Sequence, residues 1–162
     1  MSASPSLPAV WLDPPIAAQI VLIAQSYQQI LGLPLLAKIP HDVPDLIRAL
    51  WSARQVIVAH GNQADPLFFF GNAAALRAFE CDAASFTQMP SRLSAELALR
   101  EERQSLLDRV SLHGFIRDYA GIRISALGRR FAIAHAHVWN LIDANGTNHG
   151  QAACFIAPNH GQ

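Results

Sequence analysis

The stretch RRFAIAHAHVWNLIDANGTNHGQAACFIA (129–157) decides the fold. Within 131–142, large side chains take the odd positions and small or apolar ones take most even positions, a period of two that is typical of a strand. This segment carries no acidic residue, lysine or arginine, so we expect both faces of the strand to be covered. Residues 143–148 have turn chemistry, because Asn-Gly tolerates positive φ, and the chain then returns as a second strand.

The rest of the chain supplies elements that pack on this hairpin. Apolar residues at steps of three and four predict an amphipathic helix over 16–31, with Asp13 as its cap and Gly32 at its end. Asn72 and Ser94 are expected to cap two later helices. The further elements that we expect are helices over 44–53, 73–80 and 95–112, a short helical turn over 83–87, and strands over 55–60, 67–70 and 115–125.

The composition limits the classes of function. Of the 162 residues, 51% are hydrophobic and 15% are charged, against about 25% charged in typical soluble domains. The low charge suggests extensive buried surface or a partner that covers some of it. Twelve basic residues match twelve acidic ones, so direct nucleic-acid binding is not expected. Cys81 and Cys154 lie far apart, which argues against a zinc cage or a disulfide framework and favours a cytoplasmic location.

No targeting or membrane segment is expected. The first residues lack the positive charge that begins a secretory signal. The apolar stretch over 16–36 is interrupted by four glutamines, a glycine and a proline. It is therefore too polar to cross a bilayer.

Five stretches resemble the MEKHLA domain, a PAS-like family: HGNQADPLFFFGNAAALRAFE (60–80), FTQMPSRLSAE (86–96), REERQSLLDRV (100–110), DYAGIRISALGRRF (118–131) and VWNLIDANGTNHGQAACF (138–155). The order of the expected elements is also similar to that of the PAS fold. The resemblance is to the small stand-alone bacterial members of the family, whose relatives end the plant class III homeodomain-leucine-zipper transcription factors.

The resemblance implies an α+β fold, in which a PAS-like five-stranded antiparallel sheet carries helices on one face and an N-terminal amphipathic helix. We expect a flexible arm over 1–14, an N-terminal helical extension over 15–53 that packs on the sheet, the PAS-like domain over 54–157 and a tail over 158–162. It also implies sensing, partner binding or regulation more than catalysis, and it leaves the cofactor unknown.

The candidate ligand-binding residues are polar or aromatic groups of the loop before the long helix and of the last three strands. We expect a small polar or anionic ligand between the sheet and the helices, and the candidates are Arg92, Tyr119, Arg123, Trp139, Asn140 and Gln151. Arg92 lies beside two hydroxyls where a helix is expected to begin, which favours an anion. The alternative is that Arg92 pairs with Glu96 or Asp65. The strand face that carries Tyr119 and Arg123 could instead meet solvent or a second subunit.

His135 and His137 are candidate metal ligands, because a period of two places them on one strand face. If Ile142 faces His149 across the turn, His137 lies opposite Cys154, a third ligand. The alternative is that both imidazoles bond to backbone or carboxylate groups. We expect no enzyme, since the sequence has no nucleophile motif, HExxH or phosphate-binding glycine loop.

The sequence thus leaves three hypotheses for the function. The first is a non-catalytic sensory domain that binds a small molecule. The second is a homodimerising interaction module without a ligand, which the low charge content favours. The third is a metal sensor or metal-dependent enzyme built on His135 and His137, with His60 or Cys154 as a further ligand.

Overall fold

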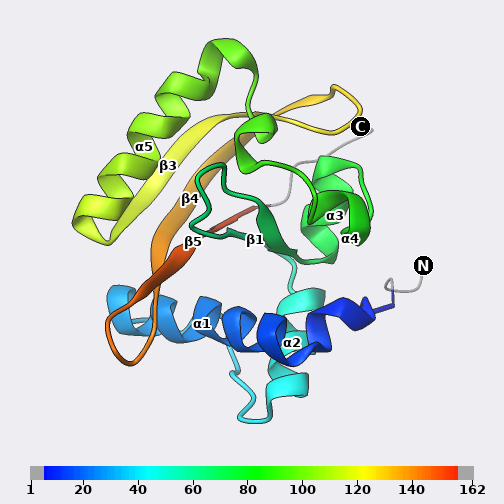
Figure 1. The fold of residues 1–162 in the computed structure, drawn as a ribbon, viewed down its shortest axis with the longest axis vertical. Coiled ribbons are helices and arrows are strands. Elements are labelled where there is room, and N and C mark those ends of the chain that lie inside the picture. Colours follow the sequence, from blue (N-terminus) through cyan, green and yellow to red (C-terminus); the bar gives the residue numbers. More distant parts are fainter. Residues whose placement is uncertain (1–5, 157–162) are drawn as a thin grey trace.

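The structure is a computed structural model that describes residues 6–156. Its strands form one antiparallel sheet in the order β2-β1-β5-β4-β3 (Figure 1). The strands span Val56–His60 (β1), Phe68–Gly71 (β2), Phe115–Ile124 (β3), Arg130–Ile142 (β4) and Asn148–Phe155 (β5). The hairpin of β4 and β5 lies at the middle of the sheet. The predicted α+β class and five-stranded antiparallel sheet are confirmed.

Helices cover both faces of the sheet (Figure 1). The outer face packs against α1 (Pro14–Leu31) and α2 (Val43–Ser52), and the inner face packs against α3 (Ala73–Phe79), α4 (Ala83–Phe86) and α5 (Arg100–His113). The described part of the chain also has three short 3-10 turns: η1 (Ala9–Leu12), η2 (Ser91–Ser94) and η3 (Leu97–Leu99). Over 6–156, no helix combines the length and the apolar character that crossing a membrane requires.

The helix α1 confirms the predicted amphipathic helix and fills the core on the outer face. Asp13 precedes it as predicted, but its side chain makes no capping hydrogen bond within 6–156. Its side chains Ile20 and Ile23 are fully buried, together with Trp139 of β4. Ser26 extends the hydrogen bonding of the sheet, because its hydroxyl accepts from the amide of Ile142 (2.8 Å) and donates to the carbonyl of the same residue (3.1 Å). This double contact ties α1 to the end of β4.

Part of the predicted arm is ordered against this core. Trp11 in η1 is fully buried, and its ring centroid lies 5.0 Å from that of Phe70. The first five residues of the arm and the tail over 158–162 lie outside the described residues.

Asn72 caps α3 as predicted, since its Oδ1 accepts from the amide of Ala75 (3.0 Å). The long helix, however, begins later than predicted. Ser94 does not cap it, because its hydroxyl donates to the carbonyl of Ser91 (2.7 Å) and closes a 3-10 turn. The helix α5 therefore starts at Arg100 rather than at residue 95.

Two bulges break the period of two in the β3–β4 pair. Asp118 and His135 adopt positive φ angles of 57° and 54°, and the register shifts at both places. An extra residue in a strand moves the following side chains to the other face. As a result, Phe131 and Ile133 on one side of the bulge share the inner face with Val138 on the other side.

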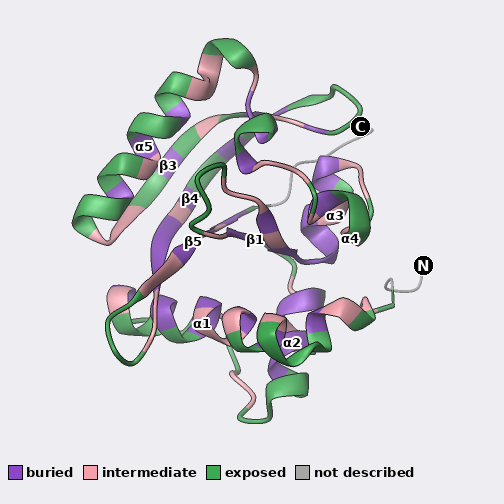
Figure 2. Cartoon of the chain, viewed as in Figure 1, coloured by how far each residue is buried: buried purple, intermediate pink, exposed green. Residues whose placement is uncertain are grey.

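The expectation that both faces of this strand are covered is therefore wrong for its first half. Ala132 and Ala134 are exposed on the outer face, whereas Trp139 to Leu141 are buried (Figure 2). The cause is that α1 covers only the second half of β4, where it contacts Ile142 and Trp139. The outer side of β3 and of the start of β4 is left open.

Candidate functional site

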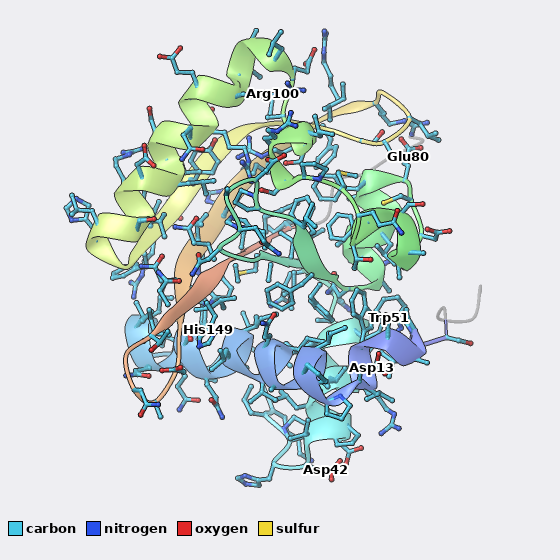
Figure 3. All side chains as sticks on the ribbon, viewed as in Figure 1. Asp13, Asp42, Trp51, Glu80, Arg100 and His149 are labelled. Carbon is cyan, nitrogen blue, oxygen red and sulfur yellow. The ribbon has the colours of Figure 1, made fainter. Side chains whose placement is uncertain are left out.

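A small cavity lies between the inner face of the sheet and α5. Its volume is about 50 Å³. Most of its wall is apolar and includes Val58, Phe79, Leu106, Ile133, Val138 and Phe155. A wider, more polar hollow of about 310 Å³ adjoins it, and the residues that line both are His60, Arg103, Leu107 and Gln151. In Figure 3 the label Arg100 marks the start of α5, which stands over this part of the sheet.

Two arginines are buried at the cavity, Arg103 from α5 and Arg123 from β3, and each is 7% exposed. Among the described residues, neither forms an ion pair with a carboxylate. Arg123 donates to the Ile122 carbonyl (2.9 Å), whereas Arg103 makes no hydrogen bond to any residue of 6–156. Burial, followed by repulsion from Arg123, lowers the pKa of Arg103 to about 10. An unpaired buried guanidinium is costly, so this position favours an anion.

Tyr119 connects Arg123 to a surface carboxylate. Its hydroxyl accepts from Nη2 of Arg123 (3.4 Å) and donates to Oε1 of Glu102 (3.0 Å). A Cβ at Gly121 would lie 2.5 Å from this hydroxyl oxygen, so glycine leaves room for the ring along the strand. Burial raises the pKa of Tyr119. Glu102 thus balances the charge of Arg123 through a neutral phenol, and Arg103 remains the cation without a counter-charge.

His60 ends β1 at the junction of the cavity and the hollow and is 8% exposed. Its Nδ1 lies 3.0 Å from the carbonyl oxygen of Gly61. Since a carbonyl can only accept, Nδ1 carries the proton in the neutral ring. Its Nε2 is buried and has no hydrogen-bond partner among the described residues. Burial is the main cause that lowers the pKa of His60 to about 4, so the ring is neutral at pH 7.

Gln151 and Asn140 form a polar bridge from the sheet to α5. Nε2 of Gln151 donates to the carbonyl of Leu107 and to the hydroxyl of Ser111, both at 3.1 Å, and lies 3.2 Å from Oδ1 of Asn140. Asn140 in turn donates to the carbonyl of Val110 (3.1 Å). Both residues were predicted to bind a ligand. Gln151 lines the cavity, whereas Asn140 does not line it and instead holds the side chain of Gln151 in place.

Arg92 does not line the cavity. It lies at the adjoining hollow and is paired with Asp65, through Nε at 3.0 Å and Nη2 at 3.3 Å. The alternative that Arg92 pairs with a carboxylate is therefore the one that the structure shows. Because a fork of two hydrogen bonds occupies this guanidinium, it is not the cation that the site offers to a ligand.

Trp139 lies on the wrong face for the predicted site. Its indole Nε1 donates to the carbonyl of Ile23 in α1 (3.2 Å), and its ring packs edge-on against Tyr27, with the ring centroids 4.8 Å apart. The bulge at His135 decides this outcome, because it sends the odd-numbered residues beyond it to the outer face.

The same bulge separates the two predicted metal ligands. His135 is exposed and lies 3.6 Å from a carboxylate oxygen of Asp118. His137 packs under α1, where its Nδ1 lies 2.8 Å from the hydroxyl of Tyr27. His137 does pair with Cys154 across the sheet as predicted, although Ile142 faces Asn148 rather than His149. Within 6–156, no three His, Cys, Asp or Glu side chains are grouped so that they could hold a metal ion.

The sequence reasoning missed Arg103 in the site and considered His60 only as a further metal ligand. The helical spacing could have identified Arg103, since it lies three, four and seven residues before Leu106, Leu107 and Val110 on α5 and therefore faces inward with them. His60 continues the alternation of Val56 and Val58 in β1, both of which lie in the inner core.

The comparison with protein families decides the classification. Residues 17–158 match the model of the MEKHLA domain. This chain belongs to the MEKHLA domain family. Two rice proteins, the homeobox-leucine zipper proteins HOX10 and HOX9 of Oryza sativa subsp. indica, are each 24% identical to it over 134 residues. The match covers 83% of this chain and 16% of each relative, so the MEKHLA domain corresponds to a small part of those proteins.

Solved structures confirm that this MEKHLA domain has a PAS-like fold. A PAS domain from Colwellia psychrerythraea has a TM-score of 0.60 at 13% identity, covering 71% of this chain and 95% of that one. The LOV domain of the blue-light photoreceptor Aureochrome1 has a TM-score of 0.53 at 12% identity, covering 77% and 89%. A PAS domain of a LuxR-family transcriptional regulator from Burkholderia thailandensis, in complex with ethanol, has a TM-score of 0.50 at 18% identity, covering 66% and 92%. At these identities the likeness concerns the fold alone.

Proposed function

We propose that this MEKHLA domain is a sensory or regulatory domain that binds a small organic anion in the inner cavity without transforming it. The observation that carries the proposal is Arg103, a buried cation without a counter-charge in the described part of the chain. A structural arginine is normally paired when it is buried. A bound anion would supply the missing partner.

The other groups at the cavity are binding groups rather than reactive ones. Arg123 and Tyr119 add a second guanidinium and a hydroxyl, both already held in place by hydrogen bonds. Gln151 fixes the edge of the cavity through its contacts with α5. The ethanol complex of the LuxR-family PAS domain supports this function, since it is a domain of like fold that holds a small molecule.

The test is binding of organic anions measured by the shift in Tm and by calorimetry, in a buffer without carboxylate or phosphate. We expect one or more small anions to stabilise the wild type, because a ligand that binds only the folded state raises its stability. Arg103→Met should abolish the effect. Arg109→Met is the matched control, because Arg109 is an exposed residue of the same helix. Absence of any anion-dependent shift in the wild type would contradict the proposal.

A second candidate function is homodimerisation through the open part of the outer face. Ala120 and Ile122 of β3 and Ala132 and Ala134 of β4 are exposed there, and Ile122 pairs with Ala132 in register. We propose that a second copy covers this small-residue surface, which fits the low charge content. Sedimentation equilibrium should then give twice 17.6 kDa, and Ile122→Lys should give the monomer mass. A wild-type monomer at micromolar concentration would contradict it.

A cytoplasmic location and the lack of direct nucleic-acid binding stay predictions from composition. Both thiols of the chain, Cys81 and Cys154, are free, which is compatible with a reducing compartment.

A further inference from the structure

The charge around the cavity indicates how many negative charges a ligand should carry. Arg103 and Arg123 bring two positive charges, and the neutral ring of His60 adds none. Glu102 offsets one of them through the hydroxyl of Tyr119. One positive charge remains, and it belongs to Arg103. A ligand with a single negative charge would therefore balance the site.

The volume of the cavity indicates the size of the ligand. A buried water needs about 10–15 Å³ of such space, so about 50 Å³ holds only a few atoms. Pockets for drug-sized ligands are roughly 300–1,000 Å³. The inner cavity itself therefore fits a molecule with a carbon chain of two to about four atoms, and not a ring system.

The wall indicates the chemistry of the rest of the ligand. Apart from the arginines, Tyr119, His60, Gln151 and Ser94, the cavity is lined by carbon, including Val58, Leu106 and Val138. A second carboxylate in this space would be desolvated without a partner, which is unfavourable. An ammonium group would be repelled by Arg103. A short alkyl group, in contrast, is stabilised there, because it moves from water into apolar surroundings.

We propose that the ligand is a short-chain aliphatic monocarboxylate, with its carboxylate at the guanidinium of Arg103 and its alkyl group against the apolar wall of the cavity. This inference rests on the proposed function and names the class of anion. The fork of an arginine matches a carboxylate in shape, and the pair gains strength where water is excluded.

The main test uses the wild-type protein and calorimetric titration with acetate, propionate, butyrate and hexanoate. Succinate, inorganic phosphate and the neutral propionamide are compared at equal ionic strength. Each methylene added between acetate and butyrate should raise the affinity about fourfold, because it is buried against the apolar wall. Hexanoate should gain no further affinity, because the apolar cavity of about 50 Å³ is then full. Propionate should bind at least about tenfold more tightly than succinate, phosphate or propionamide.

A pair of variants on β4 places the ligand in the cavity without touching a charge. Ala136 is fully buried and lines the cavity, whereas Ala132 is exposed on the outer face of the same strand. Ala136→Leu should weaken butyrate binding more than acetate binding, because the added side chain occupies the alkyl space. Ala132→Leu should leave both affinities unchanged.

The outcomes separate this inference from the proposed function. If succinate or phosphate binds in an Arg103-dependent way and the monocarboxylates do not, the anion site stands and the ligand class is wrong. If affinity does not rise with alkyl length, the placement of the alkyl group is wrong. If no anion binds, or if propionamide binds as well as propionate, both the inference and the proposed function fail.

Discussion

Replacing Arg103 by methionine should stabilise the protein in the absence of ligand. The guanidinium is buried beside Arg123 and has no carboxylate partner among the described residues. Methionine keeps an unbranched apolar side chain of similar length and removes the charge. Most core substitutions destabilise a protein, so the opposite sign is a specific consequence of an unpaired cation.

The magnitude follows from the pKa of Arg103, which burial and the charge of Arg123 lower from its ordinary value to about 10. Each pKa unit corresponds to about 1.4 kcal/mol, so the charged form is disfavoured in the folded state by roughly 3 kcal/mol. The unfolded chain does not bear this penalty, and the charge is present in both states at pH 7. After allowance for lost contacts of the side chain, we expect a gain of roughly 2 kcal/mol, within the range known for apolar replacement of buried ions.

The assay is thermal and urea unfolding in a buffer free of carboxylate and phosphate. For a domain of this size, 2 kcal/mol corresponds to a rise in Tm of about 4–8 °C. Arg109→Met, on the exposed side of α5, should change stability by less than about 0.5 kcal/mol. A fall in stability of the Arg103→Met protein without ligand would show that Arg103 already has its partner within the fold, which would refute the reasoning.

Three further predictions concern groups around the cavity. The pKa of His60 is lowered from 6.5 to about 4, so the unfolded state binds more protons between these pH values and stability rises with pH there. When the pH falls from 6.5 to 4, the free energy of unfolding of the wild type, measured in urea, should decrease by up to roughly 3 kcal/mol more than that of His60→Gln. Equal decreases would contradict a neutral buried ring. Gly150→Ala should destabilise the protein by roughly 3 kcal/mol or more, because φ is 140° and the new Cβ would overlap the carbonyl oxygen of His60. Gly128→Ala is strained but unobstructed and should destabilise it by only about 1 kcal/mol. Equal Tm values for the two variants would argue against the close approach at Gly150. Gln151→Leu should speed amide hydrogen exchange in α5, since it removes the bonds to Leu107 and Ser111, and unchanged exchange would show that the bridge does not hold the helix.

The fold was predictable where local signals and packing agree. The apolar stripe of α1 and the cap at Asn72 follow from residue spacing and from side-chain hydrogen bonding. The hairpin of β4 and β5 follows from its alternation and from its Asn-Gly turn. These features depend on neighbours in the sequence, and the structure confirms them.

The faces of β4 were not predictable by the same reasoning. Nothing in the residue types requires positive φ at Asp118 and His135, yet these two residues decide which side chains reach the cavity. One extra residue in each strand moved Trp139 from the expected site to the opposite face. Register of this kind depends on pairing between strands, which no local pattern records.

The candidate site was half predictable for a related reason. Tyr119, Arg123 and Gln151 were found because strand alternation carries them to one face. Arg103 was overlooked because α5 has charged residues on most of its surface, and its inward side holds only Arg103, Leu106 and Val110 as buried residues. The residue types alone do not distinguish the buried charge of Arg103 from the exposed charges around it on α5.

The most direct test of the anion site is a crystal structure of the protein with bromide, located by its anomalous scattering. Bromide reports a buried positive charge without any assumption about the organic ligand. The expected result is a strong bromide peak in the inner cavity at the guanidinium of Arg103, which disappears when butyrate is added. Bromide found only at exposed arginines, with the cavity empty or filled by water alone, would contradict the existence of an anion site.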